Sequence, residues 1–228
     1  MADGIEQPRA GTGLVFAAGD LPSPAVTTAA VKRRLAQHAF VVAADGGLVH
    51  ANALGVVPHL IVGDFDSVPA DLLAGYPRQA LERHPAAKDE LDLELALAAV
   101  ANAGARDVTV LGAFGDRFDQ SLAALLIAAR LAGEGQVIDL HGGRHSAWPL
   151  VTGATLEPQL EVGLTLSVVA LAADAVVSAT GLVYPLDELA VGFGTGLGVS
   201  NVVAAATATI TCVSGLIAVI VERPRQAG

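Results

Sequence analysis

The sequence predicts an α/β protein in which an open, mostly parallel, doubly wound sheet is followed by an antiparallel β-sandwich domain. Two observations lead to this expectation. As far as about residue 143, short apolar runs alternate with helix-like segments, a pattern typical of a parallel sheet with helices on both faces. From about residue 151, the chain has only short strand-like runs separated by Gly, Ser and Asp, and no convincing helix. We therefore expect two domains, 1–143 and 144–228, joined near residues 141–144.

The first domain is expected to alternate strands with helices. Apolar runs predict strands at 13–18, 40–44, 60–62, 108–111 and 137–140. Helical periodicity predicts helices at 26–37, 48–54, 89–103 and 119–132. Gly55, Gly104 and Gly133 follow the last three helices, where glycine commonly ends a helix. In the first helix, Lys32, Arg33 and Arg34 are expected to form a solvated face.

The second domain raises the question of a membrane span, because no charged residue occurs from Leu189 to Val221. That length exceeds the roughly 20 residues that a spanning helix needs. However, glycine occupies every second position from Gly192 to Gly198, which is poor for a helix. Strands are expected instead at 164–171, 175–178, 189–191, 206–213 and 216–221. We therefore expect no association with a membrane.

The composition excludes several classes of protein. Of the 228 residues, 53% are hydrophobic and 16% charged, which argues against disorder. Lys and Arg number 13 against 23 Asp and Glu, a net charge of -10, so nucleic acid is not an expected partner. Cys212 is the only cysteine, which excludes a disulfide scaffold and fits a reducing compartment. Asp3 and Glu6 stand where a signal peptide would be basic, so we expect a cytoplasmic protein.

The acidic residues concentrate in one part of the chain, since 12 of the 23 fall between Asp45 and Asp119. Three predicted strands run directly into turns that carry them: 45–47, 63–67 and 112–119. Ligands of open parallel sheets bind at the carboxyl ends of the strands. We therefore expect these turns to meet at one edge of the sheet and to form the functional site.

Asp64 and Asp66 give the sharpest signal at this edge. Residues i and i+2 of an extended segment point the same way, so both carboxylates would face one point while Phe65 turns into the core. Two converging anions favour a hard divalent cation such as Mg²⁺, which usually brings a substrate phosphate. The alternative is an Asx turn followed by a helix cap near Ser67.

Two further acidic segments open predicted helices. In 89–92, Asp92 is a candidate third metal ligand, while Asp89 is equally suited to cap the helix. In 115–120, Arg117 is placed to bind a phosphate, and the alternative for Asp119 is a cap of the helix. Lys88 is expected on the solvated surface.

Five segments together resemble the thiamine pyrophosphokinase family, in order and in spacing. They are Ala44-Asp45-Gly46-Gly47, Gly63-Asp64-Phe65-Asp66-Ser67, Lys88-Asp89-Glu90-Leu91-Asp92, Gly115-Asp116-Arg117-Phe118-Asp119-Gln120 and Gly198-Val199-Ser200-Asn201. The resemblance implies an α/β domain, a β-sandwich domain and a homodimer. It implies transfer of a pyrophosphoryl group from ATP to the hydroxyl of thiamine, with AMP as the second product and Mg²⁺ as the cofactor.

The resemblance also implies roles for individual residues. Asp64, Asp66 and Asp92 would bind Mg²⁺ and, together with Arg117, would carry catalysis. The ATP side would include Asp45, Asp89, Arg117, Asp119 and Gln120. Ser200 and Asn201 would contact thiamine, reaching the site across the dimer.

Two residues depart from the family pattern, because Leu91 replaces a usual Thr and Asp116 replaces a usual Gly. An extra carboxylate beside a phosphate-binding arginine would weaken ATP binding. These departures keep a second hypothesis open, a non-catalytic protein that binds thiamine or a nucleotide on the same fold. A nucleotide-sugar transferase is a third, since Asp-x-Asp with a divalent ion also serves that chemistry, but it explains neither Arg117 nor 200–201.

Overall fold

The computed structural model describes residues 11–224. It divides into two compact units, one comprising Met1–Ala124 with His141–Gly143 and the other Leu125–Leu140 with Arg144–Gly228. The domains 1–143 and 144–228 remain a prediction. Asp3 and Glu6, on which the expectation about a signal peptide rests, lie outside the described residues.

The first unit contains a parallel sheet, as expected. Its strands follow the order β5 (Asp107–Leu111), β1 (Thr12–Phe16), β2 (Phe40–Ala44), β3 (Leu60–Gly63) and β4 (Leu81–Arg83). Every neighbouring pair in this series is parallel. All five residues of β2 are buried, as is usual where helices cover both faces of a parallel sheet. The sequence did not predict the strand β4, because its three residues are too few to show a hydrophobic pattern.

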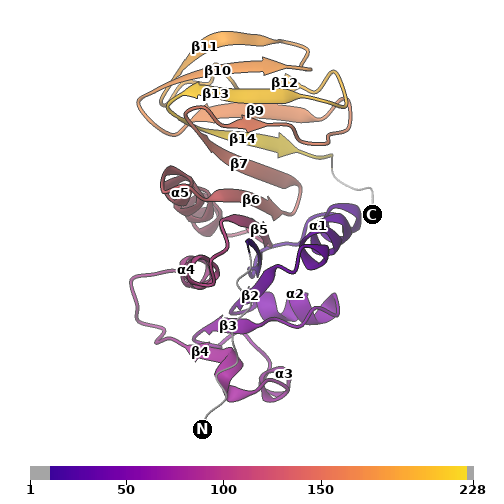
Figure 1. Cartoon of the computed structure of the whole chain (residues 1–228), viewed down its shortest axis with the longest axis vertical. Coiled ribbons are helices and arrows are strands. Elements are labelled where there is room, and N and C mark those ends of the chain that lie inside the picture. Colours follow the sequence, from indigo (N-terminus) through magenta and orange to yellow (C-terminus); the bar gives the residue numbers. More distant parts are fainter. Residues whose placement is uncertain (1–10, 225–228) are drawn as a thin grey trace. The chain divides into compact units, whose positions relative to one another are not determined.

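Helices lie on both faces of this sheet (Figure 1), with α4 on one face and α1 and α2 on the other. The helices of the whole chain are α1 (Pro24–Ala36), α2 (Gly47–Ala53), α3 (Ala70–Ala74), α4 (Asp92–Asn102) and α5 (Phe118–Gly133), with a 3₁₀ turn η1 (Arg78–Ala80). The four expected helices are confirmed. The short elements α3 and η1 escaped prediction because neither is long enough to show a hydrophobic period.

Arg34 corrects the expectation of a solvated face on the first helix. Its side chain is only 2% exposed, and its Nη2 lies 2.5 Å from Oδ1 of Asp107 at the start of β5. Its Nε also donates to the hydroxyl of Thr109 at 2.6 Å. The arginine therefore joins α1 to β5, and its burial is permitted because its charge has a partner.

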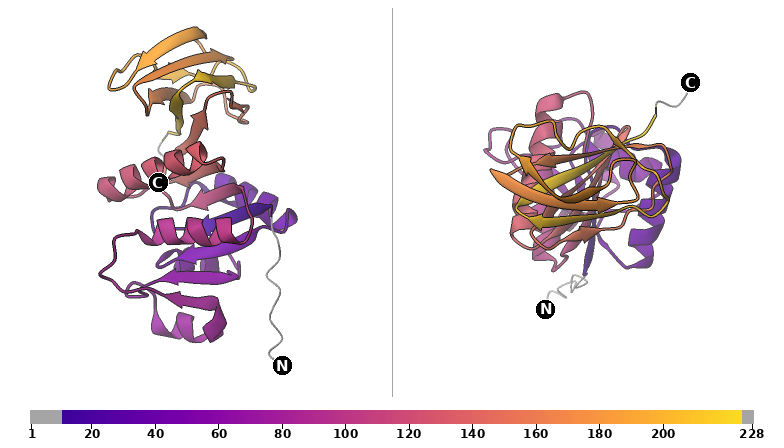
Figure 2. Two further views of the ribbon diagram at one scale, coloured as in Figure 1. Left: turned by 60° about the vertical axis from the view of Figure 1, so that its left-hand side comes forward. Right: turned by 90° about the horizontal axis from the view of Figure 1, so that it is seen from above.

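The second unit is a sandwich of two antiparallel layers, which lie face to face in the left-hand view of Figure 2. The remaining strands of the chain are β6 (Val137–Gly142), β7 (His145–Val151), β8 (Thr155–Leu156), β9 (Thr165–Ala170), β10 (Asp174–Thr180), β11 (Leu186–Gly192), β12 (Asn201–Val202), β13 (Thr209–Ser214) and β14 (Leu216–Glu222). One layer is the stretch β12-β9-β14-β7 of a ten-stranded sheet, and the other is the four-stranded sheet β11-β10-β13-β8. Alternate residues of β9, β14, β10 and β13 fill the space between the sheets, so the predicted sandwich is confirmed.

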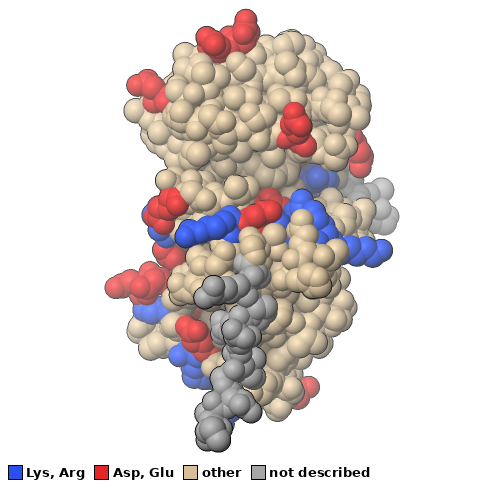
Figure 3. Space-filling model, viewed as in Figure 1, with Lys and Arg blue, Asp and Glu red and all other residues tan. Residues whose placement is uncertain are grey.

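The uncharged segment 189–221 belongs to this sandwich. Among the described residues, no helix has the length and apolar character needed to cross a membrane. The glycine series lies mainly in the turn after β11 rather than in a strand. Gly198 nevertheless packs closely on β9, since a Cβ there would lie 2.3 Å from the carbonyl oxygen of Val168. On the face drawn in Figure 3, few charged side chains cover this unit.

Candidate functional site

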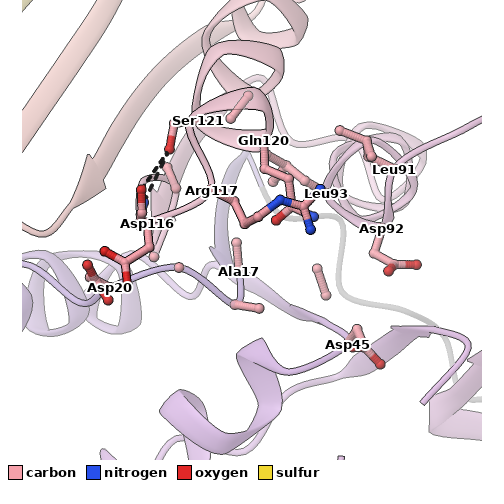
Figure 4. Close-up of a pocket in the computed structure, with 17 residues that line it drawn as sticks. Ala17, Asp20, Asp45, Leu91, Asp92, Leu93, Asp116, Arg117, Gln120 and Ser121 are labelled. Atoms are coloured by element: carbon pink, nitrogen blue, oxygen red, sulfur yellow. Dashed lines mark hydrogen bonds between the residues drawn. The ribbon is translucent and has the colours of Figure 1, made fainter. Parts of the chain in front are cut away.

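A cavity of about 390 Å³ opens at the carboxyl ends of β1, β2 and β5 in the first unit. The first turns of α4 and α5 complete its wall (Figure 4). Its lining residues are Ala17, Ala18, Gly19, Asp20, Ala44, Asp45, Leu91, Asp92, Leu93, Gly112, Ala113, Gly115, Asp116, Arg117, Gln120, Ser121 and Ala124. This is the edge at which ligands of parallel sheets bind. Of the three acidic turns expected there, 45–47 and 112–119 supply lining residues, whereas no residue of 63–67 lines the cavity.

Asp45 holds the turn that follows β3. It directly follows β2, has a φ of +42° and is 9% exposed. Its Oδ1 accepts the backbone N–H of Phe65 at 3.0 Å, and its Oδ2 accepts the hydroxyl of Ser67. Gly63 makes this approach possible, because a Cβ there would lie only 2.9 Å from the Cβ of Asp45. Asp45 therefore links the ends of two neighbouring strands.

Asp45, Asp64 and Asp66 converge, with one carboxylate oxygen from each lying within 4.8 Å of the others. The convergence does not come from a regular strand, because Phe65 has a φ of +66°. A bulky residue in that region costs on the order of 1–3 kcal/mol. The Phe65 ring is nevertheless turned into the core as expected, with 6% exposure, and packs near Leu48.

The Asx turn and the carboxylate cluster occur together, since Oδ1 of Asp64 accepts the N–H of Asp66 at 3.1 Å. The cap at Ser67 is wrong, because α3 starts at Ala70 with Pro69 as its N-cap. Repulsion from Asp64, with smaller contributions from burial and from Asp45, raises the pKa of Asp66 above its usual value. Carboxylates that repel one another in this way are a suitable set of ligands for a hard divalent cation.

Asp92 lines the same cavity but does not belong to the three-carboxylate cluster. Its Oδ1 accepts a hydrogen bond of 2.6 Å from Nζ of Lys88, and the Lys88 side chain is only 12% exposed. The helix α4 begins at Asp92 with Leu91 as its N-cap, so the expected start and cap at Asp89 are wrong. Asp89 lies in the exposed bend that precedes the helix. A metal or nucleotide role for Asp92 and Asp89 stays a prediction.

The wall formed by α5 carries Arg117 and Gln120. Arg117 donates from Nε and Nη2 to the two carboxylate oxygens of Asp119, at 2.9 and 2.6 Å. This hydrogen-bonded pairing lowers the pKa of Asp119 to about 2. Asp119 thus orients an exposed arginine whose guanidinium points into the cavity in Figure 4. Asp116 lines the cavity immediately before this arginine.

Ser200 and Asn201 lie in the other unit, at the start of β12. The amide of Asn201 is committed to the backbone: its Oδ1 accepts the N–H of Tyr184 at 3.1 Å and of Val202 at 2.9 Å, and its Nδ2 donates to the Tyr184 carbonyl at 2.6 Å. Ser200 has a φ of +65° and is exposed. Of these two residues, Ser200 has the side chain that is left for a ligand.

Sequence reasoning missed three residues of the site. Ser67 holds Asp45, Lys88 holds Asp92, and Asp20 lines the cavity. Only Lys88 left a signal in the sequence, because it stands four residues before Asp92, although α4 begins only at Asp92 and the pair therefore does not lie within a helix. The other two are brought in by neighbouring strands that the local pattern does not connect.

Two family models match the chain. Residues 31–138 match "Thiamin pyrophosphokinase, catalytic domain", and residues 154–217 match "Thiamin pyrophosphokinase, vitamin B1 binding domain". The chain belongs to the thiamin pyrophosphokinase family. It is accordingly an enzyme, and its reaction is the transfer of a pyrophosphoryl group to thiamine.

Solved structures of the family share the fold. The thiamine pyrophosphokinase from Bacillus subtilis is 22% identical with a TM-score of 0.78, over 94% of this chain and 100% of that one. A thiamin pyrophosphokinase family protein from Enterococcus faecalis is 26% identical with a TM-score of 0.72, over 94% and 99%. The enzyme from Candida albicans is 16% identical with a TM-score of 0.71, over 94% and 90%. No match was found among the curated proteins.

Proposed function

We propose that the cavity of the thiamin pyrophosphokinase family domain binds ATP together with Mg²⁺. The observation that carries this proposal is the convergence of Asp45, Asp64 and Asp66 within 4.8 Å beside the cavity. Carboxylate oxygens are the donors that Mg²⁺ prefers, so the residues present fit the ion. When bound, the ion supplies positive charge that neutralises phosphate oxygens. Asp92, on the cavity wall, is proposed to join the metal and nucleotide site.

The chain's own residues then act mainly by positioning. The thiamine hydroxyl oxygen attacks the β-phosphorus of ATP, the bond from that phosphorus to the α,β-bridging oxygen breaks, and AMP leaves. Arg117, oriented by Asp119, donates hydrogen bonds to the transferred group as charge develops on it. Lys88 keeps the Asp92 carboxylate directed into the site. A carboxylate of the cavity edge accepts the proton of the hydroxyl.

Gln120 and Asp89 belong to the nucleotide side of this proposal, and Ser200 to the thiamine side. The exposed position of Ser200 supports this role, and it lies beside Asn201, whose amide hydrogen-bonds the neighbouring turn at Tyr184. We further propose a homodimer in which this turn lies in the interface. Val183 and Tyr184 support it, since they are apolar or aromatic yet 51% and 66% exposed.

The cytoplasm is the proposed location. It is supported by Cys212, the only cysteine of the sequence, which is free and buried. A protein with one unpaired thiol has no need of an oxidising compartment.

The test mixes the full chain with Mg-ATP and thiamine and follows AMP and thiamine diphosphate. We expect AMP to form only when thiamine is present. Asp64→Asn should remove that activity, while the matched variant Asp187→Asn, on the exposed edge of β11, should keep it. Thiamine-dependent AMP that persists in Asp64→Asn would overturn the metal assignment. Tight binding of both ligands without any AMP would overturn the proposed roles of these residues in catalysis.

A further inference from the structure

Arg83 contacts the acidic turn from the neighbouring strand. It is the last residue of β4, and the parallel register places it opposite Gly63, immediately before the turn. Its Nη1 donates to the carbonyl oxygen of Asp64 at 2.5 Å. Its guanidinium carbon also lies 4.7 Å from the centre of the Phe65 ring. β4 and β3 lie side by side in Figure 1, so the contact follows from the sheet itself.

The two hydrogen bonds at this turn hold the same peptide group. The carbonyl of Asp64 accepts from Arg83, and the N–H of Phe65 donates to Asp45. The peptide that joins Asp64 to Phe65 is thus fixed at both ends by side chains from the strands on either side of β3.

This peptide needs to be held. Its orientation gives Phe65 a φ of +66°, which is unfavourable for a residue with a bulky side chain. Rotating a peptide group changes the φ of the residue that follows, so a flip would return Phe65 to the favoured negative range. The three carboxylates, which repel one another within 4.8 Å, also gain by moving apart. Both tendencies oppose the arrangement that a metal ion requires.

We infer that Arg83 is a positioning residue, which clamps the Asp64–Phe65 peptide so that Asp64 and Asp66 face the metal together with Asp45. The inference rests on the proposed metal site. Arg83 contacts the backbone carbonyl of Asp64 and the ring of Phe65, so the carboxylate oxygens of the turn remain available to bind the ion. Lysine would reproduce only part of this, because its ammonium can donate to the carbonyl but has no planar group to lie over the Phe65 ring.

Because Arg83 is positively charged, a single measurement of metal binding can distinguish a positioning role from a purely electrostatic one. If the arginine acted only through its positive charge, removing it from beside a cation site would tighten metal binding. If it positions the turn, removing it loosens the ligands and weakens metal binding. The two roles therefore predict changes of opposite sign in the same measurement.

The experiment measures Mn²⁺ binding to the nucleotide-free full chain by electron paramagnetic resonance, which counts the free ion. We expect Arg83→Met to weaken Mn²⁺ binding about 10- to 100-fold, as loss of an outer partner of a metal ligand does. Arg83→Lys should fall between that variant and the wild type. Arg78→Met, which removes an exposed arginine of η1, is the matched control and should bind Mn²⁺ as the wild type does. Melting temperatures of all variants establish that they are folded.

Unchanged or tighter Mn²⁺ binding by a folded Arg83→Met would overturn the inference and leave the proposed function intact. If the wild type itself fails to bind Mn²⁺, both the metal site and the role of Arg83 are wrong. A second readout separates positioning from a general loss of structure: excess Mg²⁺ should restore the rate of Arg83→Met, while its KM for thiamine stays that of the wild type.

Discussion

The backbone N–H of Phe65 donates a hydrogen bond of 3.0 Å to Oδ1 of Asp45, across a sequence separation of 20 residues. Through this bond the residue after β2 shapes the turn after β3. The turn in turn brings Asp64 and Asp66 to Asp45, and the three acids form the candidate metal site. The geometry of that site therefore depends on a few hydrogen bonds between adjacent strand ends.

Ser67→Ala tests the outer support of Asp45. The hydroxyl of Ser67 donates to the Asp45 carboxylate, so its loss should raise the Mg²⁺ concentration for half-maximal AMP formation by about 10- to 100-fold. Ser23→Ala is the control, because the hydroxyl of Ser23 makes no capping hydrogen bond to α1. An unchanged Mg²⁺ dependence in Ser67→Ala would show that Asp45 needs no such support.

Asp66→Asn should stabilise the metal-free protein while abolishing activity. The pKa of Asp66 is raised above 3.8, chiefly by the charge of Asp64, so the folded chain binds this proton more tightly than the unfolded chain. Stability contributed by this group therefore falls as the pH rises above 3.8 through the folded pKa. At pH 7 without metal, the asparagine removes the repulsion, and the melting temperature should rise. Asp187→Asn should not raise it, and saturating Mg²⁺ should reverse the order of the wild type and Asp66→Asn.

Arg117→Met tests the pair on the wall formed by α5. The pKa of Asp119 is about 2 because Arg117 binds its carboxylate, so the pair stays charged until the pH falls to that value. In Arg117→Met the pKa of Asp119 should return towards its ordinary value of 3.8, as followed by carboxyl carbon NMR. The KM for ATP should rise in the same variant. An Asp119 that still titrates near 2 would mean that another group stabilises its charge.

Asp116→Asn should improve the binding of Mg-ATP. Asp116 lines the cavity beside Arg117 and adds a negative charge where phosphate is expected. An exposed charge interaction is worth about 0.2–1 kcal/mol, which corresponds to a KM for ATP lower by roughly 1.4- to 5-fold. The effect should shrink at high salt, because salt screens exposed charges. Asp187→Asn removes an equal charge from the other unit, and a matching gain there would indicate a general effect of net charge.

Asn201→Ala should change the stability of the protein, whereas Ser200→Ala should change the binding of thiamine. Asn201 is buried with three hydrogen bonds to the backbone, so its loss should lower the free energy of unfolding by about 1–3 kcal/mol. Ser200→Ala should leave stability unchanged and raise the KM for thiamine. Denaturant unfolding and the AMP assay measure the two effects. The opposite pattern, with Ser200→Ala unstable and Asn201→Ala altered only in KM, would reverse the two assignments.

Local pattern was enough to predict the layers of this protein. Apolar runs and helical periods repeat within each element, so they predicted the helices α1, α2, α4 and α5 and the parallel strands without knowledge of the neighbours. Acidic turns after these strands predicted the functional edge, because parallel strands must end on the same side. The short elements α3, η1 and β4 carry too few residues for any period, and β4 is the strand that supplies Arg83.

The fold class, the family and the edge of the sheet at which chemistry occurs follow from the amino-acid sequence alone. The side chains that hold the site in place become evident only in the three-dimensional structure. Arg34 meets Asp107, Ser67 meets Asp45, and Arg83 meets Asp64 across strands or helices that are separate in the chain. The physical reason is that a hydrogen bond or an ion pair depends on distance and direction in space, and strand pairing sets both for residues far apart in the sequence.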